Sequence, residues 1–194
     1  GLMQLCGYCW SDATSYMAPG HNSVLHDRDG SWYIVYHIRE KNFVTKGEPS
    51  TMQIRKMYWT EEGWPVVSAE PYSGEVEQEI PREALQGRYE RINLACSLPQ
   101  GIQTSVPMKL KDSNDYYECC SIQGKWHYED GRITITYGPH RETAFVTAVW
   151  DHERNQPTIA LCGMSQDGVP FWAKRLGENC NIFPLSGRGE GYES

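Results

Sequence analysis

A β-hairpin is predicted over residues 125–137, which read Lys125-Trp126-His127-Tyr128-Glu129-Asp130-Gly131-Arg132-Ile133-Thr134-Ile135-Thr136-Tyr137. Apolar and polar residues alternate on both sides of the Asp130-Gly131 pair, as they do in half-buried strands. An Asp-Gly pair between two such runs is a strong signal for a tight turn. We therefore expect one strand over Lys125–Tyr128 and the next over Arg132–Tyr137.

Six further runs in the second half of the chain have strand-like composition and are separated by turn-forming residues. They are Gly87–Ala95, Val106–Leu110, Tyr116–Ile122, Thr143–Trp150, Thr158–Met164 and Val169–Lys174. Eight short strands at near-even spacing predict an antiparallel meander that closes into a small barrel over residues 85–177. The Gly-rich residues 178–194 are interpreted as a flexible tail.

The first 75 residues form a second β unit. The strands expected there are Met3–Tyr8, Val24–His26, Trp32–Ile38, Met52–Trp59 and Trp64–Val67. These five runs in roughly 70 residues, taken as about four antiparallel strands, match the content of one blade of a β-propeller. Residues 76–84 contain acids and a proline without any periodicity, and we interpret them as a linker with a short helix at Arg82–Leu85.

Charge and hydropathy exclude two classes of partner. The 18 Lys and Arg against 25 Asp and Glu give a net charge of −7, whereas binding to nucleic acid needs clustered cations. No apolar run approaches the roughly 18 residues of a membrane span. The 7 Trp and 12 Tyr outnumber the 4 Phe, and such rings suit half-buried strands or platforms for sugars.

The seven cysteines are an odd number at irregular spacing, which makes a disulfide framework improbable. We expect them to be reduced, and Cys119 and Cys120 to point to opposite faces of one strand. Cys6-x-x-Cys9 has no second pair of ligands at zinc-site spacing. Reduced cysteines favour a cytoplasmic location.

Five segments, taken in order, resemble the last propeller blade of glycoside hydrolase family 43, and most closely its endo- and exo-1,5-α-L-arabinanases. They are Ala18-Pro19-Gly20-His21-Asn22-Ser23, His37-x-Arg39, Met52-Gln53-Ile54-Arg55, Gly63-Trp64-Pro65-Val66-Val67 and Tyr72-Ser73-Gly74-Glu75. The second half is similar to the barrel that follows the propeller in two-domain members. That part rests on Gly124-Lys125-Trp126-x-Tyr128, Ile133-Thr134-Ile135 and Gly168-Val169-Pro170-x-Trp172.

The resemblance implies an all-β chain, with the final blade of a five-bladed β-propeller over 1–75 and a small lipocalin-like antiparallel β-barrel over 85–177. It implies hydrolysis of the α-1,5-L-arabinofuranosidic bonds of arabinan with inversion. The family's catalytic carboxylates lie on other blades, so we expect no catalytic residue in this chain and no activity from it alone. The partners expected are arabinan and the remaining blades, on the same or a second polypeptide.

The resemblance also implies four site residues. His21 matches the histidine that helps to hold a metal, commonly calcium, and Asn22, His37 and Arg39 would line the active site. A histidine packed in the core is the alternative for His21, bracing of the turn for Asn22, and an inter-blade salt bridge for Arg39. The acidic turn at 27–30 lacks the further ligands of a calcium loop and is interpreted as a hairpin turn.

Two other functions remain open at this stage. The chain could be a non-catalytic carbohydrate-binding protein, or a structural partner that completes a propeller supplied by another polypeptide. A polymeric substrate favours secretion, while the free cysteines favour the cytoplasm.

Overall fold

The computed structural model describes residues 3–11, 14–41, 49–95, 101–119 and 121–177, and within them the chain is almost entirely β. The elements are β1 (Tyr8–Cys9), β2 (Tyr16–His26), β3 (Trp32–Glu40), β4 (Ser50–Trp59), β5 (Pro65–Val67), the 3-10 turn η1 (Arg82–Leu85), β6 (Gly87–Asn93), β7 (Gln103–Thr104), β8 (Val106–Leu110), β9 (Asp115–Glu118), β10 (Ser121–Glu129), β11 (Arg132–Tyr137), β12 (His140–Asp151), β13 (Gln156–Ser165) and β14 (Pro170–Leu176). No helix in the described ranges is long and apolar enough to cross a membrane.

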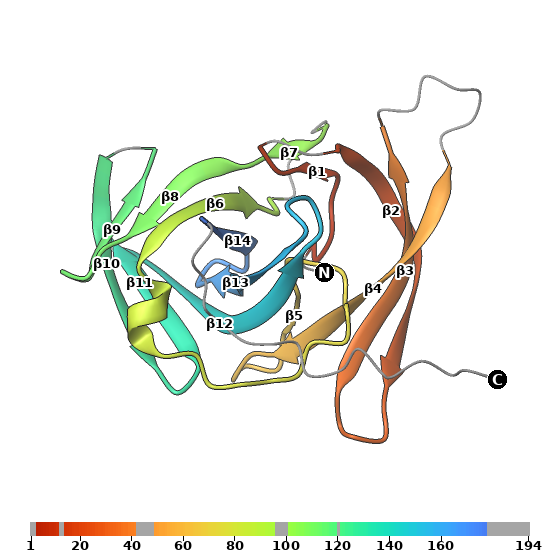
Figure 1. Ribbon diagram of the computed structural model, residues 1–194, viewed down its shortest axis with the longest axis horizontal. Coiled ribbons are helices and arrows are strands. Elements are labelled where there is room, and N and C mark those ends of the chain that lie inside the picture. The colour runs from red at the N-terminus through yellow and green to blue at the C-terminus, as the bar shows by residue number, and fades with distance from the viewer. Residues whose placement is uncertain (1–2, 12–13, 42–48, 96–100, 120, 178–194) are drawn as a thin grey trace.

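Eight strands form a closed barrel in the order β10-β11-β12-β13-β14-β6-β8-β9 (Figure 1). All neighbours are antiparallel, and the pairings of β14 with β6 and of β9 with β10 complete the circle. The predicted antiparallel barrel is therefore confirmed. Its core holds buried residues from the strands together with Ile80 and Leu85, which lie before the first barrel strand.

One predicted strand of the barrel was wrong. Tyr116–Ile122 is divided between two strands, because β9 ends at Glu118 and Cys119 turns the chain with φ 49°. β10 then runs to Glu129 and includes the segment that we expected as a separate strand. Cys119 thus lies in a turn and not on a strand face, and Cys120 lies outside the described residues.

Gly124 marks a bulge in β10, where the register against β9 shifts between Ile122 and Gly124. A Cβ atom at Gly124 would lie 1.8 Å from the carbonyl oxygen of Thr136. Only glycine fits this close approach of two backbones. The bulge lies inside β10, where the sequence had predicted a break between two strands.

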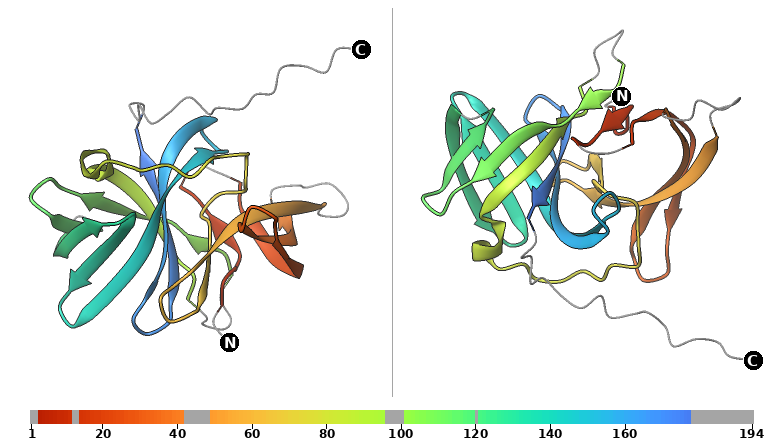
Figure 2. Two further views of the ribbon diagram at one scale, coloured as in Figure 1. Left: turned by 90° about the horizontal axis from the view of Figure 1, so that it is seen from below. Right: turned by 45° about the horizontal axis from the view of Figure 1, so that its top comes forward.

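The second sheet has six strands in the order β5-β4-β3-β2-β1-β7. Five of its strands come from the first 67 residues. The sixth, β7, lies in the barrel half of the sequence but pairs parallel with β1. The expected strand over Met3–Tyr8 is reduced to Tyr8–Cys9, and β2 begins eight residues earlier than predicted. Figure 2 shows the barrel on one side and β2, β3 and β4 curling away from it on the other.

A shared core joins the sheet to the outside of the barrel. Trp172 on β14 is fully buried there, and its Nε1 donates to the carbonyl oxygen of Val67 at 2.7 Å. The guanidinium of Arg55 lies 4.7 Å from the ring of Trp172. The segment after β5 continues along the barrel, where Tyr128 donates its hydroxyl to the carbonyl oxygen of Ile80 at 2.8 Å. The short helix expected at Arg82–Leu85 is present as η1, and the tail over 178–194 lies outside the described residues.

Candidate functional site

The predicted metal ligand His21 lies in an irregular part of β2. The register against β3 shifts on both sides of Gly20, and Ala18 and His21 both have positive φ, 52° and 46°. The Nδ1 atoms of His21 and His37 are 3.2 Å apart. Gly20 is opposite His37, and a Cβ there would lie 3.3 Å from the imidazole Nε2. The bulged strand therefore brings the two predicted histidines together.

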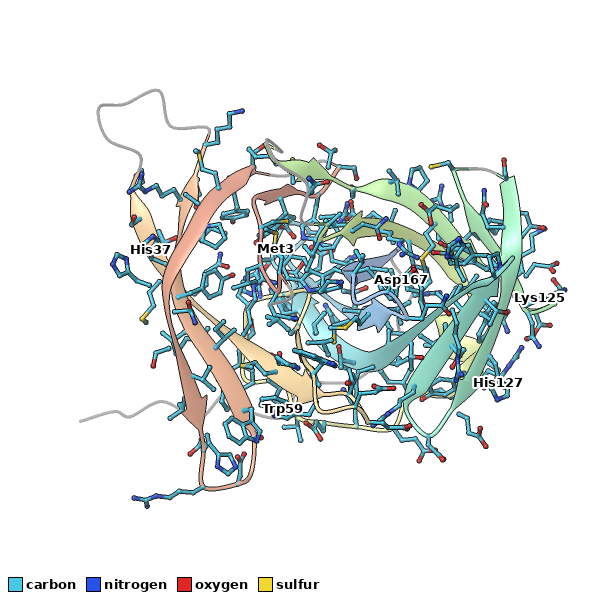
Figure 3. All side chains as sticks on the ribbon, turned by 180° about the vertical axis from the view of Figure 1, so that it is seen from behind. Met3, His37, Trp59, Lys125, His127 and Asp167 are labelled. Atoms are coloured by element: carbon cyan, nitrogen blue, oxygen red, sulfur yellow. The ribbon has the colours of Figure 1, made fainter. Side chains whose placement is uncertain are left out.

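The other two predicted residues lie beside this pair without completing a site. Asn22 is exposed on β2. Arg39 is exposed on β3, and its Nε donates to the Ser50 hydroxyl at 3.3 Å, so its described partner is not a carboxylate. Figure 3 shows His37 on the sheet at the end of the molecule that is far from His127 on the barrel.

The His21–His37 pair does not by itself fit calcium. Calcium takes six to eight oxygen ligands, whereas the pair offers two imidazole nitrogens. Nitrogen ligands of this kind suit zinc, copper or nickel better. A calcium ion at His21 would need oxygen ligands from water or from residues beyond this group.

A buried ionic cluster between the sheet and the barrel was not predicted. The Nζ atom of Lys174 lies 2.6 Å from Glu70 and 2.9 Å from Asp151, and it also contacts Glu153. Lys174 and Asp151 are fully buried and Glu70 nearly so. The three carboxylates have the spacing of metal ligands, but the ammonium group already lies among them. The cluster is therefore built as a set of ion pairs.

Burial and charge act in opposite directions on these groups. Burial raises the pKa of Glu70 to about 8, against the opposing effect of Lys174. Burial also acts to raise the pKa of Asp151, but Lys174 and Arg154 outweigh it and leave that pKa below its usual range. For Lys174, burial lowers the pKa and the three carboxylates outweigh it, so the net shift is upward. Glu70 is thus the member of the cluster whose protonated form burial favours most.

A second buried ion pair lies inside the barrel. Arg91 donates to both carboxylate oxygens of Glu142, each at 2.7 Å, and to the hydroxyl of Tyr116 at 2.9 Å. Tyr137 donates to the same carboxylate at 2.8 Å, and the guanidinium lies 4.3 Å from the ring of Phe171. The pair is satisfied on every side and has the character of a core element.

Comparison with known proteins places this architecture in a family. Residues 7–65 match the model for glycosyl hydrolases family 43. Residues 69–173, more than half of the chain, match that family's C-terminal lipocalin-like domain. The chain belongs to glycoside hydrolase family 43.

Two curated arabinanases are similar to this chain. An extracellular endo-α-(1→5)-L-arabinanase of Thermotoga petrophila is 27% identical over 171 residues, which cover 86% of this chain and 35% of that protein. A second, from Bacillus subtilis, is 24% identical over 84% of this chain and 34% of its own length. The chain spans about a third of the length of the curated relatives that it matches.

Solved structures give the same architecture. The endo-1,5-α-L-arabinanase of Thermotoga petrophila in complex with Tris superposes with a TM-score of 0.81 at 25% identity, covering 91% of this chain and 40% of that one. A family 43 glycoside hydrolase of Bacillus licheniformis has a TM-score of 0.80 at 21% identity, and so shows the fold. The resemblance drawn from sequence motifs is thereby confirmed at the level of the family.

The sequence of this family 43 chain held signals for the buried charges that motif reading missed. Lys174 follows Phe171-Trp172-Ala173 within an apolar strand, and Asp151 follows Trp150 in the same way. A charged residue inside such a run needs a buried partner. The identity of that partner, Glu70, depends on tertiary packing across 104 residues and is not readable from sequence.

Proposed function

We propose that this chain is the C-terminal part of an arabinan-degrading hydrolase, in which β1–β5 form the last blade of a five-bladed propeller and the barrel braces it. The observation that carries the proposal is the pairing of His21 and His37 on β2 and β3, in a chain that is similar to two endo-arabinanases along most of its length. The reaction is hydrolysis of α-1,5-L-arabinofuranosidic bonds with inversion. In such a reaction an acid protonates the leaving oxygen while a base activates water.

The acid and the base lie on the remaining blades, which the proposal assigns to the rest of the same polypeptide or to a second one. His21 and His37 face the active site in this arrangement, and Asn22 and Arg39 line it. A calcium ion near His21 would supply a fixed positive charge beneath the carboxylates, with its oxygen ligands coming from water and the other blades. The isolated chain has no catalytic role of its own.

The proposed location is outside the cell, as the names of both arabinanase relatives state for those proteins. Two of the four described cysteines, Cys6 and Cys162, are compatible with that location. Burial raises the pKa of Cys6 to about 11 and raises that of the fully buried Cys162 further, so both thiols stay protonated at neutral pH. Protonated and buried thiols react slowly with oxidants.

A chimera tests the proposal. The matched third of the Thermotoga petrophila arabinanase is replaced by this chain, and release of reducing ends from linear arabinan is measured. We expect activity from the folded chimera, none from the 194-residue chain alone, and a loss of at least about tenfold on His37→Ala, about 1.4 kcal/mol in barrier height. Lys125→Ala, an exposed change on the barrel, is the matched control. A folded but inactive chimera, or hydrolysis by the isolated chain, would contradict the proposal.

A further inference from the structure

A groove made of three neighbouring hollows lies between the sheet and the outside of the barrel. Its largest part has a volume of about 840 Å³ and lies between the turn Thr60–Trp64 and the outer faces of β10, β11 and β12. Two smaller hollows, of about 310 and 330 Å³, adjoin it, and Phe145 lines all three. We name these three hollows together the junction groove. The largest part has the size typical of ligand sites.

The floor of the groove is a row of polar side chains fixed on strands. His127, Thr134 and Thr143 are register partners across β10, β11 and β12, and all three line the groove. Glu129 and Arg132 form the next row on the same face, because residues two apart on a strand point to the same side. Hydroxyl, imidazole and guanidinium groups are thus held in a fixed array on regular structure.

The wall of the groove presents an indole ring. Trp64 is 48% exposed, and its backbone is held by two hydrogen bonds with Thr60, at 2.8 Å and 3.1 Å. Arg132 connects wall to floor through an ion pair of 2.9 Å with Glu61, and its guanidinium lies 4.8 Å from the ring of Phe145. A large aromatic side chain that is half exposed offers an apolar face to the C–H side of a sugar ring.

A second aromatic group lines another of the three hollows. Trp32 and Trp59 meet edge to face with ring centroids 5.5 Å apart, and His26 stacks on Trp32 at 4.1 Å. Trp59 is 41% exposed, and both tryptophans line the hollow of about 310 Å³. The groove therefore combines half-exposed tryptophans in two of its hollows with polar side chains beside Trp64, as binding to sugar units would require.

The charges along the groove favour an uncharged ligand. The charged residues that line the largest part are the acids Glu61, Glu62, Glu129 and Asp130 and the bases Arg132 and Arg141. Polyanions need clustered cations, which this mixed lining does not provide. Neutral sugars need hydrogen-bond donors and acceptors beside an apolar surface, and the groove has both.

We propose that the junction groove binds a neutral polysaccharide chain, with Trp64 stacking on one sugar ring and the row His127–Thr134–Thr143 hydrogen-bonding to its hydroxyl groups. The choice of arabinan as ligand rests on the proposed function, but binding in the groove does not depend on hydrolysis. The groove is remote from the histidine pair. Trp32 and His37 are five residues apart on β3, which corresponds to roughly 17 Å along a strand.

Calorimetric titration of the 194-residue chain with linear arabinan tests this proposal, with xylan and polygalacturonate as further probes. We expect binding to a neutral polysaccharide and none to polygalacturonate. Trp64→Ala should weaken binding by about tenfold or more, and Trp64→Tyr should stay within about threefold of the parent chain. Tyr117→Ala removes an aromatic ring from β9 that lines none of the three hollows, and it should leave binding unchanged.

A second variant keeps the test decisive if Trp64→Ala does not fold, as judged by far-UV circular dichroism. The double change Thr134→Val and Thr143→Val retains β-branched side chains and removes two hydroxyl groups, and it should weaken binding by about threefold. Absence of binding to both neutral polysaccharides, binding that persists in the folded Trp64→Ala variant, or preference for polygalacturonate would each overturn the proposal. The chimera is scored by hydrolysis, so failure of the proposed function would be seen separately.

Discussion

The barrel and the six-stranded sheet solve the problem of strand edges differently. Each barrel strand has a neighbour on both sides, and the barrel encloses its own core. The sheet is open, and its buried residues share a core with the outer face of the barrel. On β2 the successive residues Val24 and Leu25 are 48% and 50% exposed although they point to opposite faces. The sheet therefore depends on the barrel for one face and leaves the far end of β2 uncovered on both.

The largest effect is expected where the two regions meet. Lys174→Met leaves Glu70, Asp151 and Glu153 without their shared cation in a buried site. Removing one partner of a buried ion pair costs about 3–5 kcal/mol. We expect the free energy of unfolding, measured by urea denaturation, to fall by about that amount. Lys125→Met, which breaks the exposed pair with Asp115, should cost less than about 1 kcal/mol. Equal losses in the two variants would show that the buried ion pairs of Lys174 contribute no more to stability than the exposed pair of Lys125 does.

A glycine inside the barrel provides the next test. Gly163 on β13 is opposite Ala144, and an added Cβ would lie 2.2 Å from the carbonyl oxygen of Thr143 and 2.5 Å from the Cβ of Ala144. Gly163→Ala must therefore push two strands apart in a closed structure, with an expected cost of about 1–3 kcal/mol or more in the free energy of unfolding.

Gly101→Ala is the matched control, because no atom of the described residues other than its chain neighbours lies within 4 Å of its added Cβ. Thermal unfolding followed by circular dichroism compares the two variants. A Gly163→Ala protein as stable as the Gly101→Ala protein would show that β12 and β13 can move apart to admit a methyl group without loss of stability.

Glu70 gives the contact between sheet and barrel a pH dependence of its own. Its pKa of about 8 in the folded chain lies above the ordinary value near 4.5, so the folded state keeps a proton that the unfolded state has released. Stability contributed by this proton is present at low pH and is lost as pH rises from about 5 through 8. The slope cannot exceed about 1.4 kcal/mol per pH unit for one proton.

Glu70→Gln removes this contribution, so the difference in unfolding free energy between the parent chain and the variant should shrink steadily over that range. Glu61→Gln, at an exposed ion pair on the sheet, is the control and should show no such trend. A parent chain that gains stability relative to Glu70→Gln as pH rises would reverse the sign and refute the assignment.

Local sequence signals predicted most of the barrel because its turns are local. Asp130-Gly131 and Asp167-Gly168 lie between paired strands, as expected from Asp-Gly chemistry. The failures have non-local causes. The turn at Cys119 uses a residue with no turn preference, and β7 joins a sheet that belongs to the other end of the chain.

The candidate site shows the same contrast between local sequence signals and non-local contacts. Motif resemblance selected His21 and His37, and the bulged strand β2 does bring their imidazoles together. The buried ionic cluster around Lys174 was missed because Lys174 and Glu70 meet only after the barrel has closed and the sheet has packed against it. The motif led to two histidines that lie close together, whereas it carried no sign of charges that pair across the fold.

The smallest effect on stability is expected at the uncovered end of β2. Leu25→Ser changes a half-exposed side chain, so the unfolding free energy of the monomer should move by no more than about 0.5 kcal/mol. Self-association should nevertheless decrease, because an open strand with apolar residues on both faces is a template for contacts between copies. Sedimentation velocity at several protein concentrations measures this change. Val76→Ser removes a comparably exposed apolar side chain outside the sheet, and it should leave association unaltered. If both variants associate as the parent chain does, the uncovered face of β2 is not what distinguishes the open sheet from the closed barrel in solution.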